Sequence, residues 1–314
     1  MRNVRLAALF PGQGSQKVGM AQDLYAASPA AKRVLDDAEA ALPGLLRLMW
    51  QGPAEDLQLT ANQQPALVAA GAAAYAAWLE AGGPAAEFGA GHSLGEYTAH
   101  VAAGSLSVAD AVTLVRRRGT YMQEAVPEGQ GAMAAVLKLE QAAIDDVLRS
   151  VTASGAVVEV ANLNSPGQTV ISGSAQGVTA AAAALKEQGG RVIPLKVSAP
   201  FHCSLMQPAA DRLAPDLEAA GFSEPAFAIV CNVTAEPLTA PESAPALLTK
   251  QVTASVRWVE CVERLAALGA THFVEFGSGN VLTGLVGRIL PDAAALAVDS
   301  AEALARVLEE VASE

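Results

Sequence analysis

The sequence has few cysteines and few basic residues, and each shortage argues against a class of protein. Its three cysteines, Cys203, Cys231 and Cys261, are odd in number and widely spaced, and no C-x-x-C occurs. This pattern argues against a disulfide framework and a zinc site, and favours free thiols in a reducing compartment. Lysine and arginine number 20 against 32 acidic residues, which gives a formal net charge of −12. That charge argues against nucleic acid or an anionic membrane surface as a main partner.

A long apolar run is also missing. The longest run, from Pro65 to Leu79, is shorter than the roughly 20 residues that span a bilayer. It predicts a buried helix that ends near Gly82-Gly83. The N-terminal apolar run stops at Pro11-Gly12, too early for the core of a signal peptide. We therefore expect a cytoplasmic protein.

Short apolar runs alternate with helical patterns through most of the 314 residues, of which 52% are hydrophobic. A buried strand is predicted at residues 6–10, and a second one at 86–91 leads into helices at 95–103 and 107–124. Only 4% of the residues are aromatic, and the abundance of alanine indicates closely packed helices. Strand-helix alternation of this kind predicts an α/β fold with a mainly parallel sheet flanked by helices.

The pattern changes between residues 128 and 197. The predicted order there is βαββαβ, with strands at 131–139, 157–162, 168–172 and 191–197 and helices at 140–151 and 175–188. This order is typical of the ferredoxin-like split unit. We therefore expect a small ferredoxin-like subdomain at 128–197, inserted into a large hydrolase-like α/β subdomain made of residues 1–127 and 198–314. The α/β pattern then resumes with predicted strands at 227–233 and 272–276 and helices at 244–253, 258–268 and from residue 301.

The stretch GHSLGEY, Gly91 to Tyr97, fits G-x-S-x-G, the pattern of a serine on a tight strand-to-helix turn. Gly91 and Gly95 would let the strand and the helix approach closely. The amide of Leu94 would then point toward an oxyanion formed on an acyl group at Ser93. The chain has 27 glycines, so a chance match stays open at this point.

A serine nucleophile needs a base, and the chain has four histidines. His92 adjoins the serine and would diverge from it, His100 lies within the following helix, and His272 opens a predicted core strand. His202 lies on a proline-containing loop, VSAPFHCSLM, directly after the insert, where functional residues are common. A structural role for it stays open. No acid is clearly placed to orient it, but a backbone carbonyl can do so.

The stretch VRRRGTYMQ places three consecutive arginines on a helix, where they cannot share one face. We expect Arg116 and Arg117 at the surface, and Arg118 can point into the site. A buried guanidinium beside the nucleophile would pair with a second carboxylate on the substrate. The loop FPGQGSQ follows the first strand, and the N–H of Gln13 could complete an oxyanion hole; the phosphate-binding pattern G-x-x-x-x-G-K-[ST] is absent.

Six motifs together carry a family resemblance: FPGQGSQ, GHSLGEY, RGTYMQ, ANLNSPGQTVISG, APFH and QVTASVRW. In this order, and across nearly the whole chain, they resemble the malonyl-CoA:acyl carrier protein transacylases and the acyltransferase domains of polyketide synthases. The resemblance implies a catalytic set in which Ser93 is acylated, His202 is its base and the main-chain carbonyl of Gln251 holds the histidine. It also implies an oxyanion hole at Gln13 and Leu94 and substrate contacts at Arg118, Phe201, Asn162 and Asn164.

The activity implied is ping-pong transfer of malonate from malonyl-CoA to the phosphopantetheine thiol of holo acyl carrier protein, for fatty-acid synthesis. No metal or tightly bound cofactor is implied, and we expect a monomer. Phe201, before the histidine, goes with malonyl rather than methylmalonyl units in the polyketide relatives, because a bulky ring would crowd an α-methyl group. The family's carrier is itself acidic, so docking would need a basic patch, for which the candidates are Arg116, Arg117, Lys186, Arg191 and Lys196.

Three other functions are compatible with parts of this pattern. One is a serine esterase or thioesterase, which Arg118 and the lack of a placed acid speak against. Another is a polyketide-pathway acyltransferase. The third is a non-catalytic acyl-binding module, which the presence of Ser93, His202, Arg118 and Gln251 speaks against.

Overall fold

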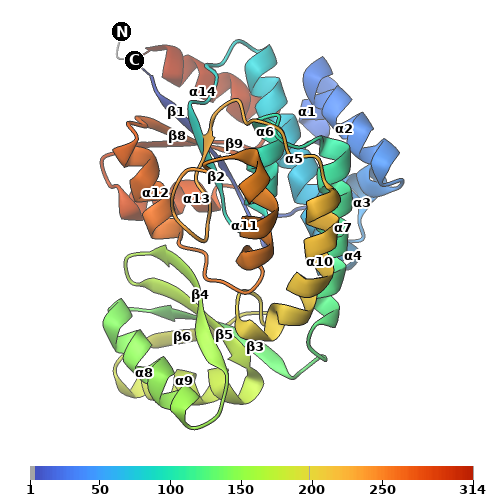
Figure 1. The fold of residues 1–314 in the computed structure, drawn as a ribbon. Helices are drawn as coiled ribbons and strands as arrows, with labels where there is room; N and C mark the ends of the chain where they lie inside the picture. Colours follow the sequence, from blue (N-terminus) through green and yellow to red (C-terminus); the bar gives the residue numbers. More distant parts are fainter. Residues whose placement is uncertain (1–3, 198, 314) are drawn as a thin grey trace.

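A five-stranded parallel sheet forms the centre of the larger part of the molecule in the computed structural model, which describes residues 4–197 and 199–313 (Figure 1). Its strand order is β7-β2-β1-β8-β9 and neighbouring strands are parallel. The strands are β1 (Leu6–Phe10), β2 (Phe88–Gly91), β7 (Ala228–Ile229), β8 (His272–Phe276) and β9 (Ala294–Val298). Every residue of β1, β2 and β8 is buried, as expected of parallel strands covered on both faces. The predicted parallel sheet is confirmed.

Helices cover both faces of this sheet, and β1 shows how the faces divide. Leu6, Ala8 and Phe10 pack in one apolar cluster with the helices of the N-terminal half, whereas Ala7 and Leu9 pack in a second cluster with α12 and α13. The helices of this part are α1 (Gln22–Ala27), α2 (Pro29–Ala41), α3 (Leu45–Gln51), α4 (Ala54–Leu57), α5 (Thr60–Glu80), α6 (Gly95–Ala102), α7 (Val108–Glu124), α10 (Gln207–Ala219), α11 (Ala244–Gln251), α12 (Trp258–Ala267), α13 (Val281–Ile289) and α14 (Ala301–Ser313).

The ends of these helices follow from local sequence. The Ser28 hydroxyl caps α2 by accepting from the amide of Ala31, and Ser107 caps α7 by accepting from Asp110. Helix α5 is buried almost all round, and nine of its 21 residues are alanine, which lets its neighbours approach closely. None of the helices in residues 4–197 and 199–313 has both the length and the apolar character needed to cross a bilayer.

The insert forms a separate antiparallel sheet with the order β4-β5-β3-β6, drawn in green and yellow-green in Figure 1. Its strands are β3 (Gly131–Leu137), β4 (Val158–Ser165), β5 (Gln168–Ser174) and β6 (Arg191–Pro194), and α8 (Gln141–Ala153) and α9 (Ala175–Glu187) pack on it around their own apolar cluster. The predicted βαββαβ order is confirmed. The exact division at residues 128 and 197 stays a prediction.

Two strands are shorter in the structure than the sequence predicts. The strand predicted at 227–233 is reduced to the two residues of β7, because the chain turns back at once: Ala235 has φ +53° and the amide of Cys231 bonds the carbonyl of Glu236. Strand β6 ends at Pro194, and residues 195–197 instead line a cleft between the two sheets. The edge strand β4 also bonds the large part, since Leu163 and Ala161 exchange backbone hydrogen bonds of 2.9 Å with Val256.

Candidate active site

Ser93 lies on the turn between β2 and α6, with φ at +51°, a region that residues other than glycine rarely adopt. Its two glycine neighbours are required by space. A Cβ added to Gly91 would lie 1.8 Å from the carbonyl carbon of Gly95, and one added to Gly95 would lie 2.0 Å from the carbonyl oxygen of Phe10. The backbone therefore presents Ser93 at the carboxyl end of the sheet, and Leu94 is the N-cap residue of the following helix, α6.

His202 is brought to Ser93 from 109 positions away in the sequence. The Ser93 Oγ lies 2.7 Å from the Nε2 of His202, and the Nδ1 of that ring lies 2.9 Å from the main-chain carbonyl oxygen of Gln251. A carbonyl oxygen can only accept, so Nδ1 carries the proton and Nε2 is free to accept the hydroxyl of Ser93. Burial lowers the pKa of His202 to about 3, and the positive charge of Arg118 acts in the same direction. The ring is therefore a neutral base near pH 7.

The lowered pKa of His202 has a testable effect on stability. The unfolded chain binds this proton near pH 6.5 and the folded chain only near pH 3, so stability falls as pH drops through that window. From pH 7 to pH 5 we expect this residue to remove about 2 kcal/mol from the free energy of unfolding. Urea unfolding of the wild type and of His202→Gln at both pH values measures this contribution, because the other shifted groups, such as His100, remain in both proteins. Identical pH dependence in the two proteins would contradict the shift.

Arg118, on α7, is completely buried beside the serine. Its Nη2 donates to Ser93 Oγ at 3.1 Å and to the side-chain oxygen of Gln251 at 3.0 Å, and its Nη1 donates to that of Gln64 at 2.9 Å. In contrast, Arg117 is exposed and pairs with Asp216. A guanidinium fixed at this position can hold a carboxylate of an acyl group bound at Ser93.

A cleft of about 540 Å³ opens over Ser93 and His202 between the two sheets. Of the residues that the sequence indicated, Gln13, Asn162 and Phe201 also line it. Asn164 lies beside the turn instead, where its Oδ1 accepts from the Nε2 of His92 at 2.8 Å. A larger hollow of about 800 Å³ lies between α10 and α11 and includes none of these side chains. We assign the chemistry to the smaller cleft because it contains the serine-histidine pair.

Three buried polar residues of the site were missed by sequence reasoning: Gln64, Glu96 and Asn232. Gln64 binds Arg118 from the apolar helix α5. Asn232 bonds both sides of the serine turn, and Glu96 bonds Asn232 and Gln251. The available signals were a glutamine next to the apolar run that starts at Pro65 and a glutamate in the first turn after the serine. Residues of these types are seldom fully buried without a hydrogen-bond partner, so each one indicates a polar contact inside the protein.

Comparison with known proteins agrees with this geometry. The acyl transferase domain family matches residues 8–304. A Bacillus subtilis (strain 168) protein named malonyl CoA-acyl carrier protein transacylase is 45% identical over 99% of this chain and 98% of its own length. The protein of that name from Escherichia coli (strain K12) is 46% identical over 97% of this chain and 99% of its own.

Solved structures that resemble this chain belong to the same group of proteins. A type II polyketide synthase acyl-carrier protein in complex with its malonyl-transacylase matches with a TM-score of 0.94 at 44% identity, covering 98% of this chain and 99% of that one. The malonyl CoA-acyl carrier protein transacylase of Coxiella burnetii matches with a TM-score of 0.94 at 40% identity, covering 98% of this chain and 97% of its own. The chain therefore belongs to the acyl transferase domain family and, within it, to the malonyl CoA-acyl carrier protein transacylases.

Proposed function

We propose that this protein transfers the malonyl group of malonyl-CoA to the phosphopantetheine thiol of holo acyl carrier protein through an ester on Ser93. One observation carries the proposal: the Ser93 Oγ lies between a neutral imidazole at 2.7 Å and a buried guanidinium at 3.1 Å. The first is a base for the serine, and the second is a partner for the free carboxylate of malonate. The names of the relatives and the carrier protein complex support the same substrates.

In the first half-reaction, the Nε2 of His202 accepts the hydroxyl proton of Ser93 while Oγ attacks the thioester carbonyl. The amides of Leu94 and Gln13 hold the resulting oxyanion. The carbon–sulfur bond breaks, and coenzyme A leaves with the proton from His202. In the second half-reaction the carrier thiol gives its proton to His202 and attacks the ester, and Ser93 recovers the proton as its bond to the malonyl group breaks.

The site differs from that of an ordinary hydrolase in two ways. There a carboxylate stabilises the imidazolium, whereas here the neutral main-chain carbonyl of Gln251 holds the ring. Arg118 also adds a partner for a second carboxylate on the acyl group, which an ordinary esterase does not need. Together with the names of the relatives, these features favour transfer over hydrolysis.

The remaining assignments are also proposals. Asn162 would guide the pantetheine arm, which must enter along the cleft that this residue lines. Asn164 would act on the arm through His92, which it bonds and which lines the same cleft. Lys196 lines the same cleft and is a docking contact for the acidic carrier, whereas Arg117 is already paired with Asp216. We propose that the protein acts as a cytoplasmic monomer that supplies extender units for fatty-acid synthesis.

The fate of malonate tests this proposal. Incubation with malonyl-CoA and holo acyl carrier protein should release coenzyme A and form malonyl carrier protein in equal amounts, as measured by intact mass. Apo carrier protein, which lacks the thiol, is the control and should accept nothing. Free malonate in place of malonyl carrier protein would identify a hydrolase, and bound malonyl-CoA without turnover would identify a binding module.

Phe201 provides a selectivity prediction. Its ring lines the cleft directly before His202, where an α-methyl group on the malonyl unit would meet it. Phe201→Ala should raise transfer from methylmalonyl-CoA relative to malonyl-CoA by roughly 10-fold, the usual effect of space for one methyl group. A competition assay with both donors measures this ratio. Leu59→Ala, at an exposed part of the same cleft, should leave the ratio unchanged, and an unchanged ratio in Phe201→Ala would contradict the role.

A further inference from the structure

Glu96 is a buried carboxyl group that the proposed mechanism does not use. It lies in the first turn of α6, three residues after Ser93, and is 1% exposed. Its Oε2 accepts from the side-chain Nε2 of Gln251 at 2.6 Å and from the backbone amide of Asn232 at 3.1 Å. A buried carboxylate is unfavourable unless hydrogen bonds compensate it, so these two contacts account for its presence at this position.

The hydrogen bond to Gln251 connects Glu96 to the base, His202, and to Arg118, the partner proposed for the substrate carboxylate. The Nε2 of Gln251, which donates to Glu96, also donates to the carbonyl oxygen of Ser93 at 3.1 Å. The other side-chain atom, Oε1, accepts from Arg118, and the main-chain oxygen accepts from His202. One glutamine therefore holds three parts of the site, and Glu96 fixes which way its amide group points.

The hydrogen bond to Asn232 connects Glu96 to the turn that carries Ser93. The Oδ1 of Asn232 accepts from the amide of Ser93 at 2.7 Å, and its Nδ2 donates to the carbonyl of Gly91 at 2.7 Å. These bonds hold the peptide groups on both sides of a strained backbone. Glu96 bonds the backbone amide of the same asparagine.

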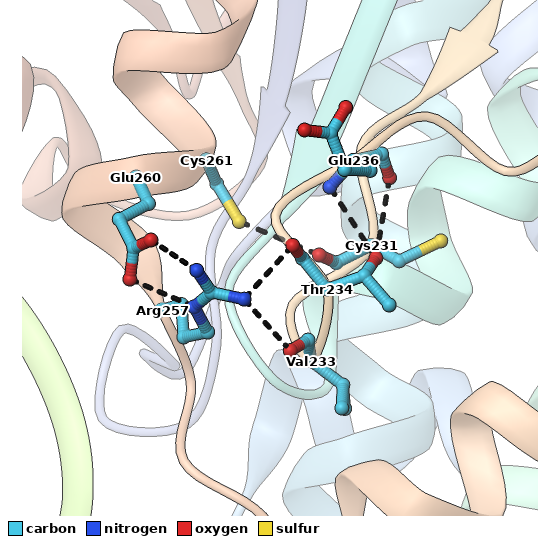
Figure 2. Close-up of polar contacts among 7 residues, drawn as sticks. All are labelled: Cys231, Val233, Thr234, Glu236, Arg257, Glu260 and Cys261. Atoms are coloured by element: carbon cyan, nitrogen blue, oxygen red, sulfur yellow. Dashed lines mark hydrogen bonds and ion pairs between the residues drawn. The ribbon is translucent and has the colours of Figure 1, made fainter.

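The loop that carries Asn232 is itself fixed from helix α12 and the residue before it, as Figure 2 shows. The Nη1 of Arg257 donates to the carbonyl oxygens of Thr234 at 2.9 Å and Val233 at 3.4 Å, and the thiol of Cys261 points at the carbonyl of Cys231 at 3.6 Å. The backbone amide of Arg257 bonds the carbonyl of Asn232 at 3.1 Å. These hydrogen bonds fix the backbone of the loop, so the amide of Asn232 is held where the Oε2 of Glu96 accepts from it.

We infer that Glu96 is a positioning residue of the transfer reaction. Through Gln251 it aligns the imidazole of His202 and the guanidinium of Arg118, and through Asn232 it supports the backbone of Ser93. It touches no substrate. Its effect depends on an acceptor oxygen at the position of Oε2, and the charge of the group is secondary.

The ionisation of Glu96 agrees with this view. Burial raises its pKa to about 7, while hydrogen bonds from Asn232 and Gln251 and the charge of Arg118 act in the opposite direction. The other titratable groups with which it interacts are Tyr97, Cys231 and Cys261. A carboxyl group that is only partly ionised near neutrality can still accept both bonds through one oxygen.

Two conservative variants separate the acceptor from the charge. Glu96→Gln keeps an oxygen at the Oε2 position and removes the charge, whereas Glu96→Asp keeps the charge and withdraws the oxygen by one methylene group. The first readout is the rate at which phenylmethanesulfonyl fluoride labels Ser93, followed by intact mass. We expect Glu96→Asp to be slower than the wild type by roughly 10-fold or more, and Glu96→Gln to stay within about 3-fold. An aspartate variant that labels as fast as the glutamine variant would overturn the inference.

The second readout, which rests on the proposed function, is steady-state malonyl transfer. Glu96→Asp should lower kcat by a larger factor than it changes KM for malonyl-CoA, because misalignment of His202 slows the chemical steps whereas misalignment of Arg118 weakens only substrate binding. A change confined to KM would contradict a positioning role for the base. Glu275→Gln is the matched control, since Glu275 is also buried with a pKa raised by burial to about 7 but bonds Thr283, away from the site. Phenylmethanesulfonyl fluoride should label Ser93 of the Glu275→Gln variant at the wild-type rate. Wild-type labelling of Ser93 without malonyl transfer would refute the proposed function and leave the labelling test of Glu96 valid.

Discussion

Replacement of Ser93 by alanine is expected to reduce malonyl transfer on the order of 10⁴-fold or more, because the variant has no atom that can form the ester. His202→Ala should cause a loss of similar size, since the serine hydroxyl then has no base within reach. The two losses should not add: the double variant should resemble each single variant, as for residues that act as one unit. The rate of malonyl carrier protein formation measures all three.

A matched control separates this effect from a loss of stability. Ser107 is an exposed serine that caps α7. Ser107→Ala should lower the free energy of unfolding by about 1 kcal/mol and leave transfer unchanged. If Ser93→Ala kept most of the transfer activity, the covalent mechanism would be wrong.

Arg118→Ala should strongly change the selectivity between malonyl and acetyl donors. The guanidinium is fully buried and held by Gln64 and Gln251, so it is preorganised for a carboxylate. Loss of one partner of a buried charge pair costs about 2–5 kcal/mol, which corresponds to roughly a 30- to 5,000-fold slower reaction with malonyl-CoA. Acetyl-CoA lacks the second carboxylate and should lose far less. The ratio of Ser93 acylation rates for the two donors is the measurement.

Arg117→Ala is the control for Arg118, because it removes the neighbouring arginine from the same helix but from its exposed side. Both donors should react with this variant at wild-type rates. An equal proportional loss for malonyl-CoA and acetyl-CoA in Arg118→Ala would exclude the carboxylate role and leave only the structural one.

Features set by local sequence were predictable. Strands β1 and β8 are short apolar runs, and a serine side chain caps α7, so these elements begin where the sequence indicates. The turn at Ser93 was also predictable, because its two glycines are required by close backbone contacts. The order of the insert followed from six clear segments.

Other elements carry ambiguous or opposing signals. Helix α10 was not predicted because it contains Pro208 and Pro215, and α13 because it contains Gly284 and Gly287. Strand β9, AALAV, has alanines and a leucine that favour a helix, yet pairs with β8 in the sheet. Tertiary pairing decided its conformation.

The supporting residues of the site could not be predicted because their partners are distant in sequence. Asn232 contacts the turn at Ser93 from 139 positions away, and Gln251 reaches Glu96 from 155 positions away. No local pattern encodes such contacts. They become visible only when a buried polar side chain is traced to its partner.

Intact mass after mixing with malonyl-CoA in the absence of an acceptor tests the central claim most directly. We expect one malonyl group on the protein, located on Ser93 by peptide mapping and absent from Ser93→Ala. Addition of holo acyl carrier protein should remove it and produce malonyl carrier protein. A malonyl group on another residue, or release of free malonate without any labelled protein, would contradict the account.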